Sequence, residues 1–78
     1  MSQLLYFTAP WCGPCKLLKP KLNQLNVPYR TINIDQDMST PKKYNVRNIP
    51  CFMRVNAQGQ EVSRIVGDSV TIDNIKRL

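Results

Sequence analysis

The stretch YFTAPWCGPCK, residues 6–16, decides how the rest of the chain is interpreted. It begins inside the short apolar run Gln3–Thr8, whose two aromatic residues are typical of a buried strand. Two prolines and a glycine interrupt the pattern over residues 9–14, and leucines then recur at helical spacing over residues 14–26. The two cysteines of this stretch therefore lie where a strand passes into a helix.

The later residues continue an alternation of strands and helices. A proline in the first turn suits the start of the first helix, and Pro20 predicts a kink within it. Strands are predicted at residues 29–34, 51–56 and 61–66, with Gly59 at a positive φ in the hairpin loop 57–60. A short helix is predicted around residues 40–45, capped by Ser39 or Thr40 with Pro41 at its first position, and a last helix at about residues 70–78. The order β-α-β-α-β-β-α predicts an α/β fold with a four-stranded mixed sheet flanked by helices.

The predicted topology brings distant segments to one edge of the sheet. The first β-α-β unit should be right-handed with parallel strands, and the third strand is expected antiparallel beside the first. The loop at residues 9–15, the turn at Ile49 and Pro50, and the loop at residues 66–68 then meet. Asp35, which ends the second strand, lies at the same edge. Open α/β sheets carry their chemistry at such an edge.

The cysteine pair in Trp11-Cys12-Gly13-Pro14-Cys15 predicts redox chemistry. Cysteines three residues apart across a helix start can close a disulfide with little backbone change. The first-turn N–H groups should stabilise a thiolate on Cys12, while Cys15, inside the helix, should be more deeply buried and keep its proton. We therefore expect Cys12 to attack a substrate disulfide and Cys15 to resolve the mixed disulfide. Gly13 would let a substrate backbone approach, Pro14 would restrain the turn, and Trp11 would offer an apolar surface.

The length and composition of the chain argue against membrane, nucleic-acid and metal-binding functions. A length of 78 residues predicts one domain, 1–78, and neither a membrane-spanning run nor a signal peptide is recognisable, so a cytoplasmic location is expected. The net charge of +6 comes from scattered residues without a nucleic-acid motif, which makes nucleic acid an unfavoured partner. Three cysteines and no histidine argue against a structural zinc site, and no metal or other cofactor is expected. Cys51 is interpreted as a small core residue, with an alternative disulfide or glutathionylation as the competing role.

The cysteine motif and several later segments of the sequence resemble the thioredoxin family. The resemblance runs from residues 6–16 through Pro20, residues 33–35 and residues 44–50 to Gly59, Val66 and Gly67, and so covers most of the chain. It implies that Pro50 is the family's cis-proline facing the cysteines. With Ile49 and Gly67 it would then bind the substrate as an extended strand.

The sequence also departs from the family pattern. The match begins at the strand leading into the cysteines, so the family's usual first strand and helix have no counterpart. The length and element order are similar to a glutaredoxin-sized minimal fold, as in small phage and archaeal redox proteins. The family's buried aspartate and a lysine near it are replaced by Tyr6 and Thr31. Asp35 or a water molecule is the hypothesised substitute in proton transfer.

The resemblance implies a thiol–disulfide oxidoreductase that reduces protein disulfides and is recharged by a flavoprotein thioredoxin reductase. One alternative is a glutaredoxin-like reductase recharged by glutathione, although Gly67-Asp68 only partly matches a glutathione site and the motif is C-G-P-C rather than C-P-Y-C. Another is a thioredoxin-fold binding subunit of a larger enzyme. A monomer without membrane contact is expected. Arg54, in a predicted central strand, is expected to be solvated.

Overall fold

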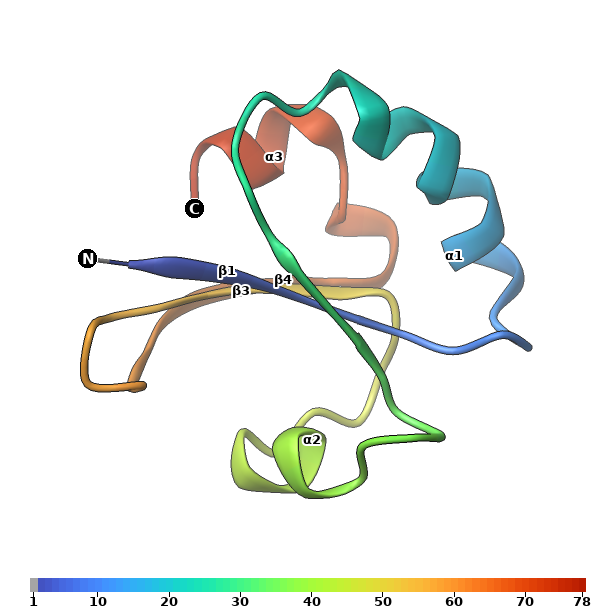
Figure 1. The fold of residues 1–78 in the computed structure, drawn as a ribbon. Coiled ribbons are helices and arrows are strands. Elements are labelled where there is room, and N and C mark those ends of the chain that lie inside the picture. Colours follow the sequence, from blue (N-terminus) through green and yellow to red (C-terminus); the bar gives the residue numbers. More distant parts are fainter. Residues whose placement is uncertain (1) are drawn as a thin grey trace.

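The computed structural model describes residues 2–78 as a four-stranded sheet with helices on both faces (Figure 1). In chain order the elements are β1 Gln3–Thr8, α1 Gly13–Leu18, the 3₁₀ helix η1 Lys19–Gln24, β2 Arg30–Asn33, α2 Ser39–Lys43, β3 Cys51–Val55, β4 Glu61–Val66, the 3₁₀ helix η2 Gly67–Ser69 and α3 Ile72–Lys76. The predicted fold class and order of strands and α-helices are confirmed.

The sheet has the strand order β2-β1-β3-β4. β1 pairs with β2 in parallel, β1 with β3 antiparallel, and β3 with β4 antiparallel, as the sequence predicted. Cys51 at the start of β3 is opposite Phe7 near the end of β1 and opposite Val66 at the end of β4. This register brings the cysteine loop and the loops that precede β3 and follow β4 to one edge.

Helices cover both faces of the sheet. Successive side chains of β1 point to opposite faces, so β1 contributes to the apolar packing on each. Leu4 and Tyr6 pack under α1, η1 and α3 in one apolar cluster, and Leu5 and Phe7 pack in a second cluster on the side of α2 (Figure 1). A run of four buried residues in β1 is therefore the signature of a strand inside a three-layer arrangement.

The sequence predicted a single first helix with a kink at Pro20. The structure instead has an α-helix followed by a 3₁₀ helix. The change occurs at Lys19, one residue before Pro20. Proline has no N–H to donate to the carbonyl four residues earlier, so the α-helical ladder cannot continue through it. The last helix is also shorter than predicted. It begins at Ile72 because the Thr71 side chain accepts a hydrogen bond from the Asn74 N–H, at 3.2 Å.

The capping of α2 differs from the prediction. Neither Ser39 nor Thr40 is the N-cap, and Pro41 is the third helical residue. Asp37 provides the cap instead: Oδ1 accepts from the Thr40 N–H at 3.0 Å, and Oδ2 accepts from the Thr40 hydroxyl at 2.6 Å. The Ser39 hydroxyl also donates to Asp37. These hydrogen bonds, those of Thr40 first, lower the pKa of Asp37 to about 2.

Arg54 is half-buried and hydrogen-bonded, so the expectation of a solvated side chain is wrong. Its Nε donates to the carbonyl oxygen of Leu78 at 2.6 Å, and a terminal nitrogen donates to the Ser2 hydroxyl at 2.7 Å. The guanidinium therefore ties β3 to the residues that follow α3 and precede β1. In the β3–β4 hairpin, Gly59 has the predicted positive φ, +79°.

Candidate active site

The cysteine pair is joined as a disulfide at the start of α1. The Cα atoms of Cys12 and Cys15 are 5.2 Å apart, within the usual range for a disulfide. Cys12 is the N-cap residue in an extended conformation, and the Cys15 N–H donates to its Sγ at 3.2 Å. The same N–H is placed to stabilise negative charge on Cys12 once the bond is reduced.

The two sulfurs differ in surroundings rather than in burial. Cys12 is 4% exposed and Cys15 is 3% exposed, so the two residues are almost equally buried in the disulfide form. Both pack with Ala9, and Ile34 and Ile49 close the cluster. The chemical asymmetry of the pair therefore comes from the position of each cysteine in α1 and from the groups around it.

On one side lies a surface that we call the front surface, formed by Trp11, Pro14, Pro50 and Gly67. The Ile49–Pro50 bond is cis, as the resemblance implied. The Gly67 N–H donates to the Pro50 carbonyl at 2.9 Å, with Gly67 at φ +59°. Pro14, Pro50 and Gly67 line one hollow of about 270 Å³. The three segments expected to converge are therefore together.

Trp11 and Asp35 form a contact that the sequence analysis did not predict. The Trp11 side chain is 64% exposed, and its indole N–H lies 3.2 and 3.1 Å from the two carboxylate oxygens of Asp35. The carboxylate thus holds the exposed indole at the edge of the front surface. Its hydrogen-bond partner is Trp11, not Cys15.

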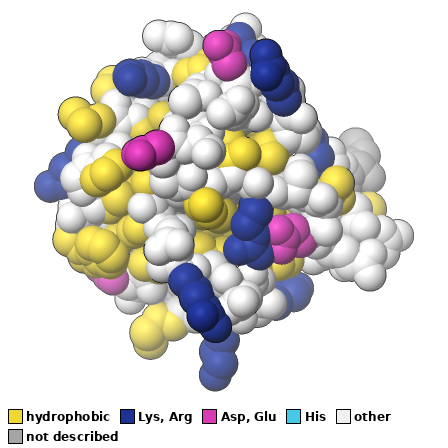
Figure 2. Space-filling view, turned by 180° about the vertical axis from the view of Figure 1, so that it is seen from behind, with side chains coloured by type: hydrophobic (Ala, Val, Ile, Leu, Met, Phe, Trp, Pro, Cys, Tyr) yellow, Lys and Arg dark blue, Asp and Glu magenta, His cyan; other side chains and the backbone are white. Residues whose placement is uncertain are grey.

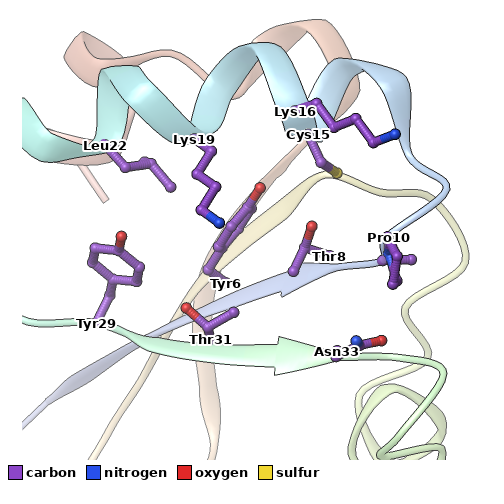
Figure 3. A pocket seen from close by; sticks show the side chains of 11 residues that line it. Tyr6, Thr8, Pro10, Cys15, Lys16, Lys19, Leu22, Tyr29, Thr31 and Asn33 are labelled. Atoms are coloured by element: carbon purple, nitrogen blue, oxygen red, sulfur yellow. The ribbon is translucent and has the colours of Figure 1, made fainter.

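On the other side lies the rear cavity, which we define by Tyr6, Thr8, Cys15, Lys19 and Thr31 among its lining residues. It has a volume of about 410 Å³ and lies between α1 and η1 above and β1 and β2 below (Figure 3). Thr8 and Lys19 line this cavity but were not among the site residues predicted from the sequence. The available signal was spacing, because Lys19 is four residues after Cys15 and so shares its helical face.

Cys51 is the remaining cysteine, and the structure confirms that it is a core residue. It is fully buried in the cluster on the α2 side of the sheet. Burial raises the pKa of its thiol to about 11, with the positive charge of Arg64 opposing the effect.

A metal site, a membrane-spanning helix and a charged patch are three further features that could indicate another function. Residues 2–78 contain no group of three or more histidine, cysteine, aspartate or glutamate side chains placed to hold a metal ion. No helix in the described part of the chain is long and apolar enough to cross a membrane. On the face shown in Figure 2, Lys and Arg side chains are spread among acidic ones rather than gathered in one patch.

Comparison with known sequences gives a consistent result. The family model described as Thioredoxin matches residues 1–77. The chain is 40% identical over 70 residues to a thioredoxin of Haemophilus influenzae, with 82% of this chain and 64% of that protein covered. It is 39% identical over 67 residues to a chloroplastic M-type thioredoxin of Brassica napus, with 78% and 37% covered. The chain thus spans about two fifths to two thirds of the length of these relatives.

Solved structures agree in fold. A thioredoxin from Nicotiana alata superposes with a TM-score of 0.81 at 28% identity, covering 97% of this chain and 68% of that one. A thioredoxin from Fasciola hepatica superposes with a TM-score of 0.80 at 29% identity, covering 97% and 79%. Nearly the whole described chain therefore has a counterpart in these folds.

Proposed function

Because the chain belongs to the thioredoxin family, we propose that it is a thiol–disulfide oxidoreductase that reduces protein disulfides through Cys12 and Cys15. The observation that carries the proposal is the Cys12–Cys15 disulfide at the start of α1, with the Cys15 N–H donating to the Cys12 sulfur. Residues 1–78 form one thioredoxin-like domain in this proposal.

The reaction starts from the reduced pair. The Cys12 thiolate attacks one sulfur of the substrate disulfide, forming a mixed disulfide and releasing the other substrate sulfur as a thiolate that takes a proton from solvent. Cys15 then loses its proton and attacks Cys12. The bond between Cys12 and the substrate breaks, the second substrate thiol leaves, and the Cys12–Cys15 disulfide forms. Two electrons pass from the protein to the substrate in each cycle.

The front surface supplies the substrate site. We assign substrate contact to Trp11, Gly13, Pro14, Ile49, Pro50 and Gly67. Gly13 and Pro14 are exposed beside the sulfurs, and Trp11 offers an indole that is 64% exposed. An extended substrate segment can lie along Ile49 and Pro50, where its backbone would form hydrogen bonds as an added strand. Asp35 supports this surface by orienting Trp11.

The oxidised pair must be reduced again before the next cycle. The reductant in this proposal is a flavoprotein thioredoxin reductase, with glutathione as the alternative, and the protein acts as a cytoplasmic monomer without a cofactor of its own. Only Gly67 and Asp68 favour glutathione as the reductant. The residues between the cysteines are Gly-Pro, whereas a glutaredoxin would usually have Pro-Tyr there.

Insulin-disulfide reduction tests the proposal. The wild type is supplied with NADPH and thioredoxin reductase, or with NADPH, glutathione and glutathione reductase, with Cys12→Ser as the inactive control. Turnover with the first system is expected. Turnover with the second alone would make the protein functionally a glutaredoxin. Turnover with neither, while the cysteine pair still oxidises and reduces, would contradict the proposal and favour the binding-subunit alternative.

A further inference from the structure

The rear cavity gives Cys15 an environment of its own. Its lining includes Tyr6 and Thr8 from β1, Thr31 and Asn33 from β2, and Lys19 from η1 (Figure 3). Lys16 and Lys19 are the charged residues among the described lining residues, and Tyr6 and Tyr29 are the other titratable groups besides Cys15. No carboxylate belongs to this lining, so a proton leaving Cys15 meets hydroxyls, amides and positive charge.

Tyr6 does not serve as the base. Its ring stacks on Phe52, with centroids 4.9 Å apart, and meets Tyr29 edge-on at 6.2 Å. Burial raises the pKa of Tyr6 above its ordinary value of 10.0, and a side-chain hydrogen bond with Thr8 partly offsets the effect. The phenol therefore stays protonated near neutral pH. The Tyr6 and Thr8 hydroxyls are neutral groups that can hold a water molecule in the cavity.

Lys19 brings the charge. It follows Cys15 by four residues, which places the two side chains on one face of the helical segment. In Figure 3 its ammonium group points down into the cavity toward Tyr6, whereas the Lys16 ammonium points away along the rim. Lys19 is an exposed residue, and a positive charge near a sulfur favours the thiolate over the thiol.

We propose that Cys15 gives up its proton into the rear cavity and that Lys19 is a positioning residue that stabilises the resulting thiolate. This inference rests on the proposed function. In the mixed disulfide, the Cys15 thiol passes its proton to water held in the cavity. The Cys15 thiolate then attacks Cys12, and the bond between Cys12 and the substrate sulfur breaks. The departing thiolate carries the negative charge out and takes a proton from solvent.

The reaction with 5,5′-dithiobis(2-nitrobenzoate) isolates this step. Cys12 attacks the reagent and releases the first nitrothiobenzoate, and Cys15 then attacks Cys12 and releases the second. Stopped-flow absorbance separates the two phases across a pH series. In Lys19→Met we expect the second phase to slow about three- to tenfold at pH 7, with its pH profile displaced upward. Lys19→Arg keeps the charge and should keep the wild-type profile.

Lys21→Met is the matched control, because Lys21 is also exposed on η1 but lines the hollow of the front surface. Lys21→Met should change the rate of the first phase at least as much as Lys19→Met does. It should leave the rate of the second phase unchanged. An unchanged second phase in Lys19→Met overturns the inference, as does equal slowing in Lys19→Arg or in Lys21→Met. A Lys19-dependent second phase in a protein that fails to reduce insulin would overturn the proposed function and leave this inference standing.

Discussion

The front surface and the rear cavity lie on different faces of the α1–η1 segment that carries the disulfide, and different kinds of residue line them. At the front, Trp11 is 64% exposed, and the Gly67 N–H is paired with the carbonyl of the buried Pro50. At the rear, Tyr6 is 4% exposed and shares its cavity with Thr8 and Lys19. In the proposed mechanism, the front surface binds the incoming substrate chain and the rear cavity receives the proton that leaves Cys15. Two cysteines of almost equal burial can therefore have different roles.

The largest contrast should appear when the aromatic residue of each side is truncated. Tyr6→Ala removes a buried ring stacked on Phe52 and should lower the free energy of unfolding by about 3 kcal/mol. Trp11→Ala removes an exposed ring and should change it by less than about 0.5 kcal/mol while raising the KM for insulin. Urea denaturation and the insulin assay measure the two effects.

Tyr6→Phe keeps the ring and separates packing from the hydroxyl. It should retain most of the stability lost in Tyr6→Ala. If Trp11→Ala proved as destabilising as Tyr6→Ala, the division between a binding surface and a packed wall would be wrong.

A smaller effect is expected from the glycine that shapes the front surface. Gly67 has φ +59°, and a Cβ added there would meet open space, so Gly67→Ala should cost about 1 kcal/mol through backbone strain alone. The same strain should disturb the hydrogen bond to Pro50 and raise the KM for insulin. Thermal unfolding together with steady-state kinetics tests this expectation.

Gly13→Ala is the control, because a Cβ at Gly13 also meets open space and its φ lies outside the left-handed region. It should leave the unfolding free energy nearly unchanged. If both substitutions lowered the free energy of unfolding equally, the positive φ of Gly67 would not be the cause of the destabilisation.

Asp35→Ala should sharpen the assignment of Asp35 to the front surface. The carboxylate accepts the Trp11 indole N–H, so its removal should free the indole. Trp11 is the only tryptophan, and its fluorescence anisotropy decay reports this motion directly. The rate at which Cys15 resolves a mixed disulfide should stay within about twofold of the wild type. A larger loss in that rate, with Trp11 unchanged, would return Asp35 to a role in proton transfer.

The smallest effect should come from Asp37, which belongs to neither side. Its pKa is about 2 in the folded protein against an ordinary 3.8, so its stabilising contribution is complete above about pH 4 and is lost as the pH falls toward 2. Asp37→Ala should flatten stability against pH in that window without changing reduction kinetics at pH 7. Thr40→Ala, which removes one of the donors, should give part of the same change. An unaltered acid profile in Asp37→Ala would remove this cap from the account.

The strands were the most predictable part of the fold. β1 and β4 have the predicted bounds, because an apolar run that ends at prolines and a hairpin loop with Gly59 are local signals. Helix details were less accessible. Pro20 marks a break, but the sequence does not say whether the helix bends or changes to a 3₁₀ helix. The cap of α2 was expected from Ser39 or Thr40, and only the folded backbone places the Asp37 carboxylate over Thr40.

The candidate site divides in the same way. The cysteine pair and the approach of Gly67 to Pro50 follow from a motif and from strand order, which the sequence carries. The contact between Trp11 and Asp35 joins residues 24 positions apart and depends on two side-chain orientations. Lys19 was counted among scattered surface charges, because its direction into the rear cavity depends on how η1 packs over β1. Contacts of this kind are set by tertiary packing rather than by local pattern.

The assignment of attack to Cys12 and resolution to Cys15 is tested most directly by trapping the mixed disulfide. Reduced Cys15→Ser and reduced Cys12→Ser are each mixed with a disulfide-bonded peptide and followed by intact-mass and peptide-mapping mass spectrometry. The account predicts that Cys15→Ser accumulates a peptide adduct on Cys12 and that Cys12→Ser forms almost none. Rapid accumulation of an adduct on Cys15 in Cys12→Ser would contradict it.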